Sequence, residues 1–265
     1  LYRLRRRGVV FVNPFCMQNK RTMNAILSRD ERVRSHVPAT QNYSWAAFKR
    51  GLHSGQSLIL KPVIGSVGRG IFKATPLPER RVSVTGQFTA ELSLASARGY
   101  LRARIRPDHY LVQECINLAR YEGKPFDLRI PVQRDGKGEW AVAGMVAKVA
   151  LRHSFLTNVG QGGRAMPGVE VLNSAFGPSL ALSLQADVER LAIDVAQAVA
   201  GTYTYAADLG LDIGVDVDGK PWLIEVNTRD QRITFHQAGL HEVFRQVYAN
   251  PILYCAYLSQ LLEGS

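Results

Sequence analysis

The chain has 265 residues, 46% of them hydrophobic, and a formal net charge of +11. It can bury a substantial core and suits one large or two small domains, with acidic partners such as nucleotides, nucleic acid, acidic peptides or anionic surfaces. The apolar run 8–12 is too short for a signal peptide or a membrane span, so no membrane partner is expected. Three cysteines without CxxC spacing (Cys16, Cys115 and Cys255) fit a reducing compartment, which predicts a cytoplasmic location.

Much of the positive charge is concentrated near the start of the chain, in Arg3, Arg5, Arg6 and Arg7 and again in residues 20–34. Such clusters are more often a solvated face than a nucleic-acid site, so nucleic acid is not expected as a partner. The chain starts without Met, and we interpret residues 1–18 as the tail of an N-terminal domain that is missing from this sequence.

In chain order, apolar spacing predicts helices over 19–33, 42–53, 89–104, 179–200 and 241–262, the last broken near Pro251. Strands are predicted over 57–61, 71–74, 81–84 and 109–113, and as an antiparallel pair over 127–133 and 140–150. Strands and helices intermix with hairpins and give no simple βαβ repeat. This pattern favours an α+β fold with mainly antiparallel sheets.

The segment 211–227 predicts a hairpin folded at Asp218-Gly219, because Asp-Gly between apolar runs is a strong signal for a two-residue turn. That turn pairs Val217 with Lys220 and places Asp212 opposite Glu225 and Gly210 opposite Asn227.

Period-2 alternation then separates two faces of the hairpin. The apolar face carries Trp222 and Ile224, and the other face carries Leu223 with Asp212, Glu225 and Asn227. A surface hairpin without any binding role would also alternate apolar and polar residues. However, opposed carboxylates repel unless a cation or a proton lies between them. We therefore expect a divalent metal ion at Asp212, Glu225 and Asn227, whereas Asp216 and Asp218 serve only the turn.

A second signal is the segment from Lys61 to Gly70, with glycines at 65, 68 and 70. Glycines allow backbone N–H groups to approach and hold phosphate oxygens. The segment is neither a P-loop nor GxGxxG, since Lys61 precedes the glycines at the end of a strand. An ordinary Gly-rich connection remains the alternative for the loop alone, but Mg²⁺ is typically held by one or two carboxylates plus phosphates, so loop and hairpin together indicate a metal–nucleotide site.

Between these two signals, the strand that ends at Gln113–Ile116 could offer backbone groups to the edge of adenine. Asp127 and Arg129 project to one face of the next strand, and Lys148 ends an apolar run. The alternatives are a surface ion pair for the first two and a solvated strand end for Lys148.

At this point the chain resembles the ATP-grasp superfamily, and more closely the YheC/YheD endospore coat-associated family. Five segments carry the resemblance, in order: 60–71, 112–116, 126–129, 157–163 and 223–227. The resemblance implies an ATP-grasp fold of two α+β subdomains that clamp a nucleotide, over 19–110 with the glycine loop and over 111–265 with the metal hairpin.

The resemblance also implies roles for individual residues. ATP would be bound by Lys61, by the loop residues Ser66, Gly68, Arg69 and Gly70, by the hinge residues Gln113, Glu114, Cys115 and Ile116, by Asp127 on the ribose, and by Lys20 and Asn158. Arg129, Lys148 and Arg164 would be catalytic residues that face the phosphates and the acceptor, and Asp212, Glu225 and Asn227 would hold two Mg²⁺ ions. After Asn227 the chain departs from the Pro-Gly turn of many ATP-grasp enzymes, which leaves Arg229 and Arg232 as candidates for the acceptor end.

The implied activity is that of an ATP- and Mg-dependent carboxylate–amine ligase that forms an amide through an acylphosphate, with an amino acid or peptide as a possible substrate. Two alternatives stay open. One is a nucleotide-binding spore-coat or scaffold protein without turnover, and the other is a basic protein associated with nucleic acid.

Overall fold

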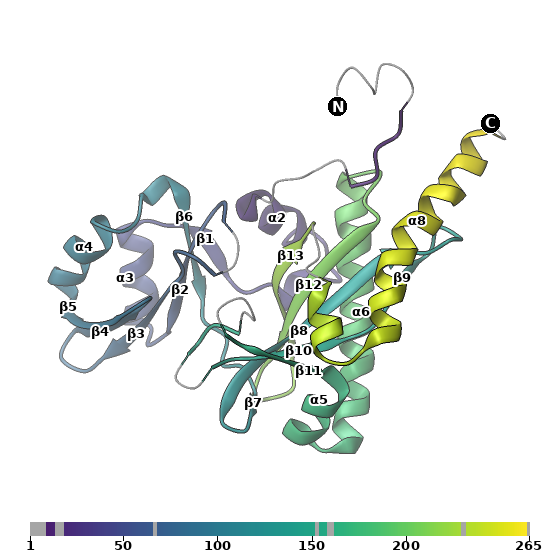
Figure 1. Ribbon diagram of the computed structural model, residues 1–265. Helices are drawn as coiled ribbons and strands as arrows, with labels where there is room; N and C mark the ends of the chain where they lie inside the picture. The colour runs from purple at the N-terminus through teal and green to yellow at the C-terminus, as the bar shows by residue number, and fades with distance from the viewer. Residues whose placement is uncertain are drawn as a thin grey trace.

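The computed structural model of the chain describes residues 9–13, 19–65, 68–151, 154–157, 162–228 and 232–263 (Figure 1). Two antiparallel sheets, each with its own helices, stand side by side in this view. The mainly antiparallel α+β architecture predicted from the sequence is therefore confirmed. No helix among the described residues is both long enough and apolar enough to cross a bilayer.

The first sheet has six strands in the order β1-β6-β2-β3-β4-β5. Their bounds are Thr40–Asn42 (β1), Leu58–Pro62 (β2), Phe72–Leu77 (β3), Arg81–Thr85 (β4), Thr89–Ser93 (β5) and Tyr110–Glu114 (β6), with the 3₁₀ turn η2, Pro107–His109, before β6. Helices α3 (Trp45–His53) and α4 (Leu94–Arg102) pack on this sheet around the buried side chains of Phe48, Leu60 and Leu101. The predicted division at residue 110 thus falls at the first residue of β6, a strand in the interior of this sheet.

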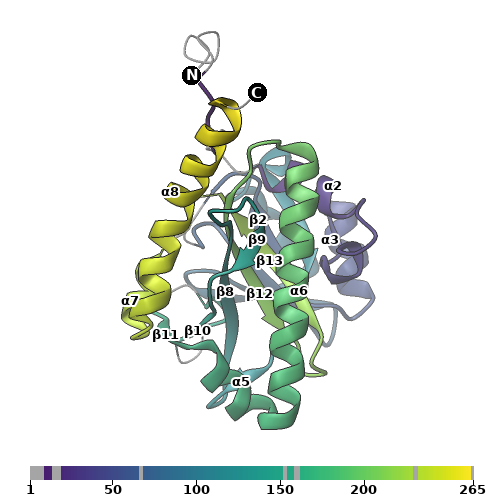
Figure 2. The same cartoon turned by 90° about the vertical axis from the view of Figure 1, so that its right-hand side faces the viewer.

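The second sheet is built around β8 (Lys124–Arg134) in the order β11-β10-β8-β12-β13, and β7 and β9 also pair with β8. The other strands are Arg120–Tyr121 (β7), Trp140–Val142 (β9), Val146–Val149 (β10), Arg164–Pro167 (β11), Asp208–Val215 (β12) and Pro221–Asn227 (β13). Helices lie on both sides of this sheet: α6 (Pro178–Thr202) runs along one side and α8 (His241–Glu263) along the other (Figure 2).

The two faces of β8 differ in chemistry because successive side chains point to opposite sides. Phe126, Leu128, Ile130 and Val132 are fully buried in the core with the apolar side of α6. Asp127, Arg129 and Gln133 lie on the other face. Helix α5 (Gly168–Phe176) adds Val171 and Leu172 to the core, and α7 (Ile233–Gln237) leads into α8.

Helix α2 (Lys20–Leu27) lies between the two sheets (Figure 1), and the 3₁₀ turn η1 (Arg34–His36) follows it and contacts β13. Met23, Leu27 and Val33 belong to the core of the second sheet. Asn19 caps the helix by accepting hydrogen bonds from the backbone N–H groups of Arg21 and Thr22.

Three predicted helices have different bounds in the structure. The predicted helix 19–33 ends at Leu27, and a turn at Asp30 follows. The predicted helix 42–53 begins only at Trp45, after a Ser44 cap. The predicted helix 89–104 is wrong in its first part, because 89–93 form the edge strand β5, and Ser93 then caps α4 by accepting from the N–H of Ser96.

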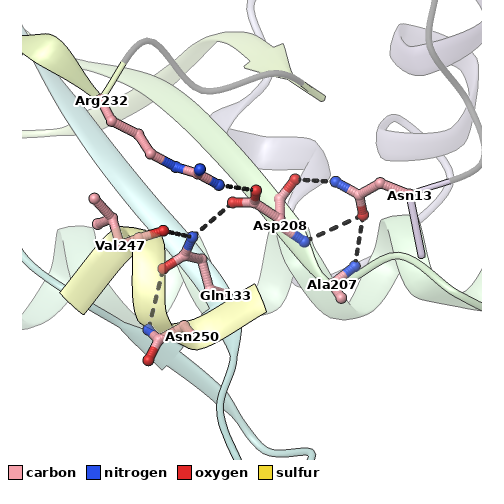
Figure 3. A network of polar contacts seen from close by, with 7 residues as sticks. All are labelled: Asn13, Gln133, Ala207, Asp208, Arg232, Val247 and Asn250. Atoms are coloured by element: carbon pink, nitrogen blue, oxygen red, sulfur yellow. Dashed lines mark hydrogen bonds and ion pairs between the residues drawn. The ribbon is translucent and has the colours of Figure 1, made fainter. Parts of the chain in front are cut away.

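Helix α8 continues through Pro251, so the predicted break is also wrong. Proline lacks the N–H that would bond to the carbonyl four residues earlier, that of Val247. Figure 3 shows what replaces it: the buried Gln133 Nε2 donates to the Val247 oxygen at 2.9 Å, and Gln133 Oε1 accepts from Asn250 Nδ2 at 3.0 Å. A side chain of the sheet thus completes the helix.

The same network continues to the start of β12 (Figure 3). Gln133 Nε2 also donates to Asp208 Oδ1 at 2.7 Å, and Asp208 Oδ2 pairs with Arg232. The Asn13 side chain accepts from the backbone N–H groups of Ala207 and Asp208, at 2.8 and 3.2 Å, and donates to the Asp208 carbonyl. Asp208 is therefore linked directly to Asn13 and, through Gln133, to α8.

Candidate nucleotide and metal site

The hairpin of β12 and β13 places Asp212 opposite Glu225 and Gly210 opposite Asn227, as predicted. Directly paired residues in a sheet share one face, so both carboxylates and the amide lie on the same side. This side is the one that carries Asp127 and Arg129 on β8, because Arg129 is the partner of Asp212 in the β8–β12 pair.

The turn itself differs from the prediction. Asp216 N–H donates to the Lys220 carbonyl at 3.0 Å, which leaves a three-residue loop in which Gly219 has φ +85°. Asp216 serves this turn, as expected: Oδ1 accepts from the N–H groups of Asp218 and Lys220, and Oδ2 accepts from Trp222 Nε1 at 2.8 Å. The predicted pair of Val217 and Lys220 is wrong because the loop is one residue longer than a two-residue turn.

A β-bulge in β13 corrects for this longer loop. Ile213 pairs with Leu223 whereas Asp212 pairs with Glu225, so Ile224 is the extra residue. The bulge reverses the predicted faces near the turn: Leu223 is 4% exposed in the core, whereas Ile224 lies at the cavity beside Glu225.

Asp212 lies at the centre of a buried ionic cluster. Its Oδ1 accepts from Arg129 Nε at 2.7 Å and from Lys148 Nζ at 2.8 Å, and its Oδ2 accepts from Arg129 Nη2 at 3.2 Å and Asn227 Nδ2 at 3.3 Å. Lys148 also contacts Asp127 Oδ1 at 3.1 Å. Three neighbouring strands thus bring together two carboxylates and two cations that the sequence had marked as site residues.

Burial and charge oppose each other in this cluster. Burial alone would raise the pKa of Asp212, but the charges of Arg129 and Lys148 lower it well below its usual range. Burial likewise lowers the pKa of Lys148, and the attraction of Asp127 and Asp212 more than offsets this, so the net shift is upward. For Asp127 burial prevails and its pKa is raised. Asp212 is therefore the firmly ionised acid of the pair.

A cavity of about 860 Å³ adjoins this cluster and has walls from both sheets. The first sheet contributes Ile59, Lys61 and Lys73, and the second contributes Asp127 and Glu225. The volume is in the range of small-molecule sites.

Lys61 is a buried cation in the wall of this cavity. Its Nζ donates to Gln113 Oε1 at 3.0 Å, and Gln113 Nε2 donates in turn to Thr40 Oγ1 at 2.7 Å. Within the described ranges no carboxylate lies within ion-pair distance of Lys61. Burial lowers its pKa to about 8, with Glu225 acting to raise it and Lys20 to lower it. An ammonium group held by a neutral amide is an incomplete arrangement, and an anion in the cavity would complete it.

The glycine loop after Lys61 is tied at both ends. Lys20 Nζ donates to the Gly65 carbonyl at 2.8 Å and pairs with Glu225 Oε1 at 3.0 Å. At the far end Tyr110 OH donates to the Gly70 carbonyl at 3.0 Å. Gly68 and Gly70 have φ of +70° and +73°, which side chains other than glycine rarely adopt. Gly68 and Gly70 are therefore required by backbone conformation.

The predicted hinge residues Gln113, Glu114, Cys115 and Ile116 all line the cavity. Glu114 uses its own carboxylate to accept from the N–H of Ala39 at 2.7 Å, which joins β6 to the segment before β1. Burial raises the pKa of the Cys115 thiol, so this cysteine is held as the neutral thiol.

The remaining predicted residues are not all brought to this place. Arg164, the exposed first residue of β11, is paired with Val149, whose neighbour Lys148 points to the cluster; Arg164 therefore projects from the opposite face of the sheet. Arg69 is exposed on the glycine loop. Ser66, Asn158 and Arg229 lie outside the described residues.

The structure also adds residues that the sequence had not marked. Thr157 Oγ1 donates to Asp127 Oδ2 at 2.6 Å, and Thr40 supports Gln113. Neither threonine carries a local signal for this role. Lys73 and Thr75, in contrast, face the cavity at alternating positions of β3, so strand alternation could have identified them.

The donor set suits a magnesium ion held partly by phosphates. Among the described residues, no three His, Cys, Asp or Glu side chains gather as a metal-binding group. Glu225 lines the cavity and is 28% exposed, whereas Asp212 is enclosed by Arg129 and Lys148. One accessible carboxylate and one enclosed carboxylate fit a metal that takes its other ligands from a nucleotide, and they do not make an all-protein cage.

Two antiparallel sheets on either side of a cavity that holds a buried lysine and an acidic hairpin define the ATP-grasp fold. The ATP-grasp ligase PsnB has this fold: its structure superimposes with a TM-score of 0.56 at 18% identity, over 96% of this chain and 68% of PsnB.

The family model for YheC/D-like ATP-grasp proteins matches residues 8–258. The chain therefore belongs to the YheC/D-like ATP-grasp family, as the sequence motifs predict. Endospore coat-associated protein YheD of Bacillus subtilis (strain 168) is 24% identical over 251 residues, which are 91% of this chain and 54% of YheD. Endospore coat-associated protein YheC of the same organism is also 24% identical, over 91% of this chain and 68% of YheC. The chain thus spans about half the length of YheD.

Proposed function

We propose that the chain binds ATP with Mg²⁺ in the cavity and uses it to join a carboxylate to an amine. The observation that carries this proposal is Lys61, a buried ammonium at the end of β2 whose hydrogen-bond partner is the neutral amide of Gln113. Phosphate oxygens would supply the negative charge that this lysine lacks. The structural neighbour PsnB is an ATP-grasp ligase, and one of its structures was determined with Mg and ADP, which supports the same pairing here.

In the proposed reaction an acceptor carboxylate oxygen attacks the γ-phosphorus of ATP. The bond from this phosphorus to the β–γ bridging oxygen breaks, and ADP leaves with its electron pair. An amine then attacks the acyl carbon, loses a proton, and displaces inorganic phosphate to leave an amide. Such phosphoryl transfer depends mainly on positioning and charge neutralisation, which Lys61, Lys148 and Arg129 would provide.

Magnesium, when bound, would neutralise phosphate charge, and Glu225 and Asn227 would hold it beside Asp212. Lys148 and Arg129 already pair with Asp212, so the phosphates would compete with this carboxylate for the two cations. Gln113 to Ile116 would contact the adenine and Asp127 the ribose, with Lys20 and Gly68 to Gly70 near the phosphates. Ser66 and Asn158 retain their predicted roles at the phosphates, and Arg164 is a candidate only if the acceptor extends around the edge strand β11.

A thermal-shift titration with Mg·ATP tests nucleotide binding. We expect a rise in melting temperature that Lys61→Met abolishes, because the variant removes the buried cation. Lys137→Met is the matched control, since it removes the same charge from an exposed turn between β8 and β9. Equal responses of the two variants would refute binding at Lys61.

Turnover is tested separately, by ADP release in the presence of amino acids and short peptides as carboxylate and amine donors. The second candidate function is that of a nucleotide-binding coat or scaffold protein without turnover, and it is favoured by the description of both YheD and YheC as endospore coat-associated. A melting-temperature shift without ADP release from any acid and amine pair would select this second function.

A further inference from the structure

Lys20 lies where three parts of the molecule meet. Its backbone N–H donates to the Val63 carbonyl at 3.0 Å, and its ammonium donates to the Gly65 carbonyl at 2.8 Å. The same ammonium pairs with Glu225 Oε1 at 3.0 Å. The first residue of α2 therefore joins the start of the glycine loop to the acidic hairpin.

The position of this lysine is fixed by packing. Asn19 caps α2, and Met23 and Leu27 anchor the helix in the core of the second sheet. The Lys20 side chain is 10% exposed, and that of its partner Glu225 is 28% exposed. A partly buried ion pair is screened less by solvent and salt than a surface pair, so the 3.0 Å contact places a persistent positive charge at Glu225.

A divalent ion and the Lys20 ammonium would compete for the same carboxylate. Asp212 offers no alternative site for the ion, because Arg129 and Lys148 already occupy its oxygens. Both hairpin carboxylates are thus neutralised by cations of the protein itself.

We propose that Lys20 is an internal competitor of the metal ion and makes metal binding depend on the nucleotide. This inference rests on the proposed function. Without phosphates, Lys20 holds Glu225 and weakens metal binding there. The phosphates of a nucleotide give the ammonium another anionic partner and release Glu225 to the metal. Since such coupling is reciprocal, the metal strengthens nucleotide binding by the same factor.

Mn²⁺ binding measured by electron paramagnetic resonance, alone and with a non-hydrolysable ATP analogue, tests the proposal. Lys20→Gln removes the charge and keeps an N–H donor for the Gly65 carbonyl. We expect this variant to bind Mn²⁺ alone about tenfold more tightly than the wild type, and to lose a similar factor of the enhancement by the analogue.

Arg21→Gln is the matched control, because it removes one positive charge from the adjacent position of the same helix. Arg21 is exposed and donates to the Asp108 carbonyl, not to a carboxylate. The affinity of the Arg21→Gln variant for Mn²⁺ alone should stay within twofold of the wild type. Circular dichroism verifies folding, and Lys20→Met replaces Lys20→Gln if the glutamine variant is unfolded.

Unchanged or weaker binding of Mn²⁺ alone by Lys20→Gln would overturn the inference, as would an equal gain in Arg21→Gln. If the wild type binds the Mn²⁺–analogue complex in that case, the proposed function stands and only the competition by Lys20 is refuted. A wild type that binds Mn²⁺ neither alone nor with the analogue would refute both.

Discussion

Strand β12 carries two aspartates on one face, the buried Asp212 and the half-buried Asp208, and their surroundings differ. Asp212 and Asp208 are separated along this face by Gly210, and each is bonded to the residue opposite it on β8: Asp212 to Arg129, and Asp208 to Gln133. Each also pairs with a cation from outside these two strands: Asp212 with Lys148, and Asp208 with Arg232. From the strand alone, the two positions look equivalent.

The difference lies in what covers each end. Asp212 shares Lys148 with Asp127, which lines the cavity. Asp208 instead bonds to Arg232, Asn13 and Gln133, and Gln133 in turn bonds to α8 (Figure 3). An aspartate paired with a cation inside the fold is therefore not sufficient evidence for a ligand site. An adjoining cavity with the buried ammonium of Lys61 in its wall distinguishes the Asp212 end of the strand, the candidate binding end, from the Asp208 end, here called the fastening end.

Replacing Asp212 should have the largest effect. Asp212→Asn leaves Arg129 and Lys148 buried with only Asp127 as an acid, and breaking such a pair costs about 3–5 kcal/mol in the free energy of unfolding. The rise in melting temperature with Mg·ATP should also be lost. Urea unfolding and the thermal-shift titration measure both quantities, and a retained nucleotide response would contradict the role of Asp212 in the site.

The same substitution at Asp208 should separate stability from binding. Asp208→Asn weakens the bonds to Arg232 and Gln133 and should lower the free energy of unfolding by about 1.5–3 kcal/mol, the usual range for hydrogen bonds to charged groups. The temperature shift caused by Mg·ATP should remain that of the wild type. Loss of that shift would show that the two ends of β12 are coupled and not separate.

Gln133→Leu tests whether the Gln133 side chain stabilises α8 at Pro251, near the fastening end of β12. It leaves the Val247 carbonyl without its donor and should cost about 2 kcal/mol in unfolding free energy. Pro251→Ala restores a backbone N–H for this carbonyl. In the Pro251→Ala background, Gln133→Leu should therefore cost about 1 kcal/mol less in unfolding free energy than in the wild type. Urea unfolding of the four proteins in the cycle measures this coupling, and simple additivity would contradict the repair of α8 by Gln133.

The smallest effect concerns pH at the binding end. The Lys61 pKa of about 8 keeps the group charged at pH 7 and leaves it mostly neutral at pH 9. An anion binds the charged form, so nucleotide binding takes up a proton, and affinity should fall about tenfold from pH 7 to pH 9. Calorimetry at the two pH values measures this fall. Lys61→Arg stays charged throughout, and an equally steep fall in that variant would assign the effect to another group.

The parts of the site that the sequence predicted are those with a local pattern. Turn chemistry at Gly219 and alternation in β12 and β13 identified the opposed acids, and the spacing of glycines identified the loop after Lys61. The register near the turn was missed because Asp-Gly suits both a two-residue turn and the three-residue loop that is present. Alternation then assigned Leu223 and Ile224 to the wrong faces.

The supporting contacts could not be predicted in this way. Thr157 reaches Asp127 across 30 residues, and Asn13 reaches the start of β12 across 195. Such contacts depend on how the sheets and helices pack, and no local periodicity encodes them. For the same reason the sequence suggested a break at Pro251, since the donor that prevents it comes from a distant strand.

The bulge at Ile224 inserts one unpaired residue into strand β13 of the hairpin. Regular pairing that starts from the three-residue loop would place Ile224, not Glu225, opposite Asp212. Strand β13 therefore has one residue more than regular pairing needs, and Ile224 is that residue. A deletion at this point would restore regular alternation and leave the two carboxylates facing each other. The surplus residue thus leaves the pairing of the two acids intact and adds an apolar side chain to the wall of the cavity beside Glu225.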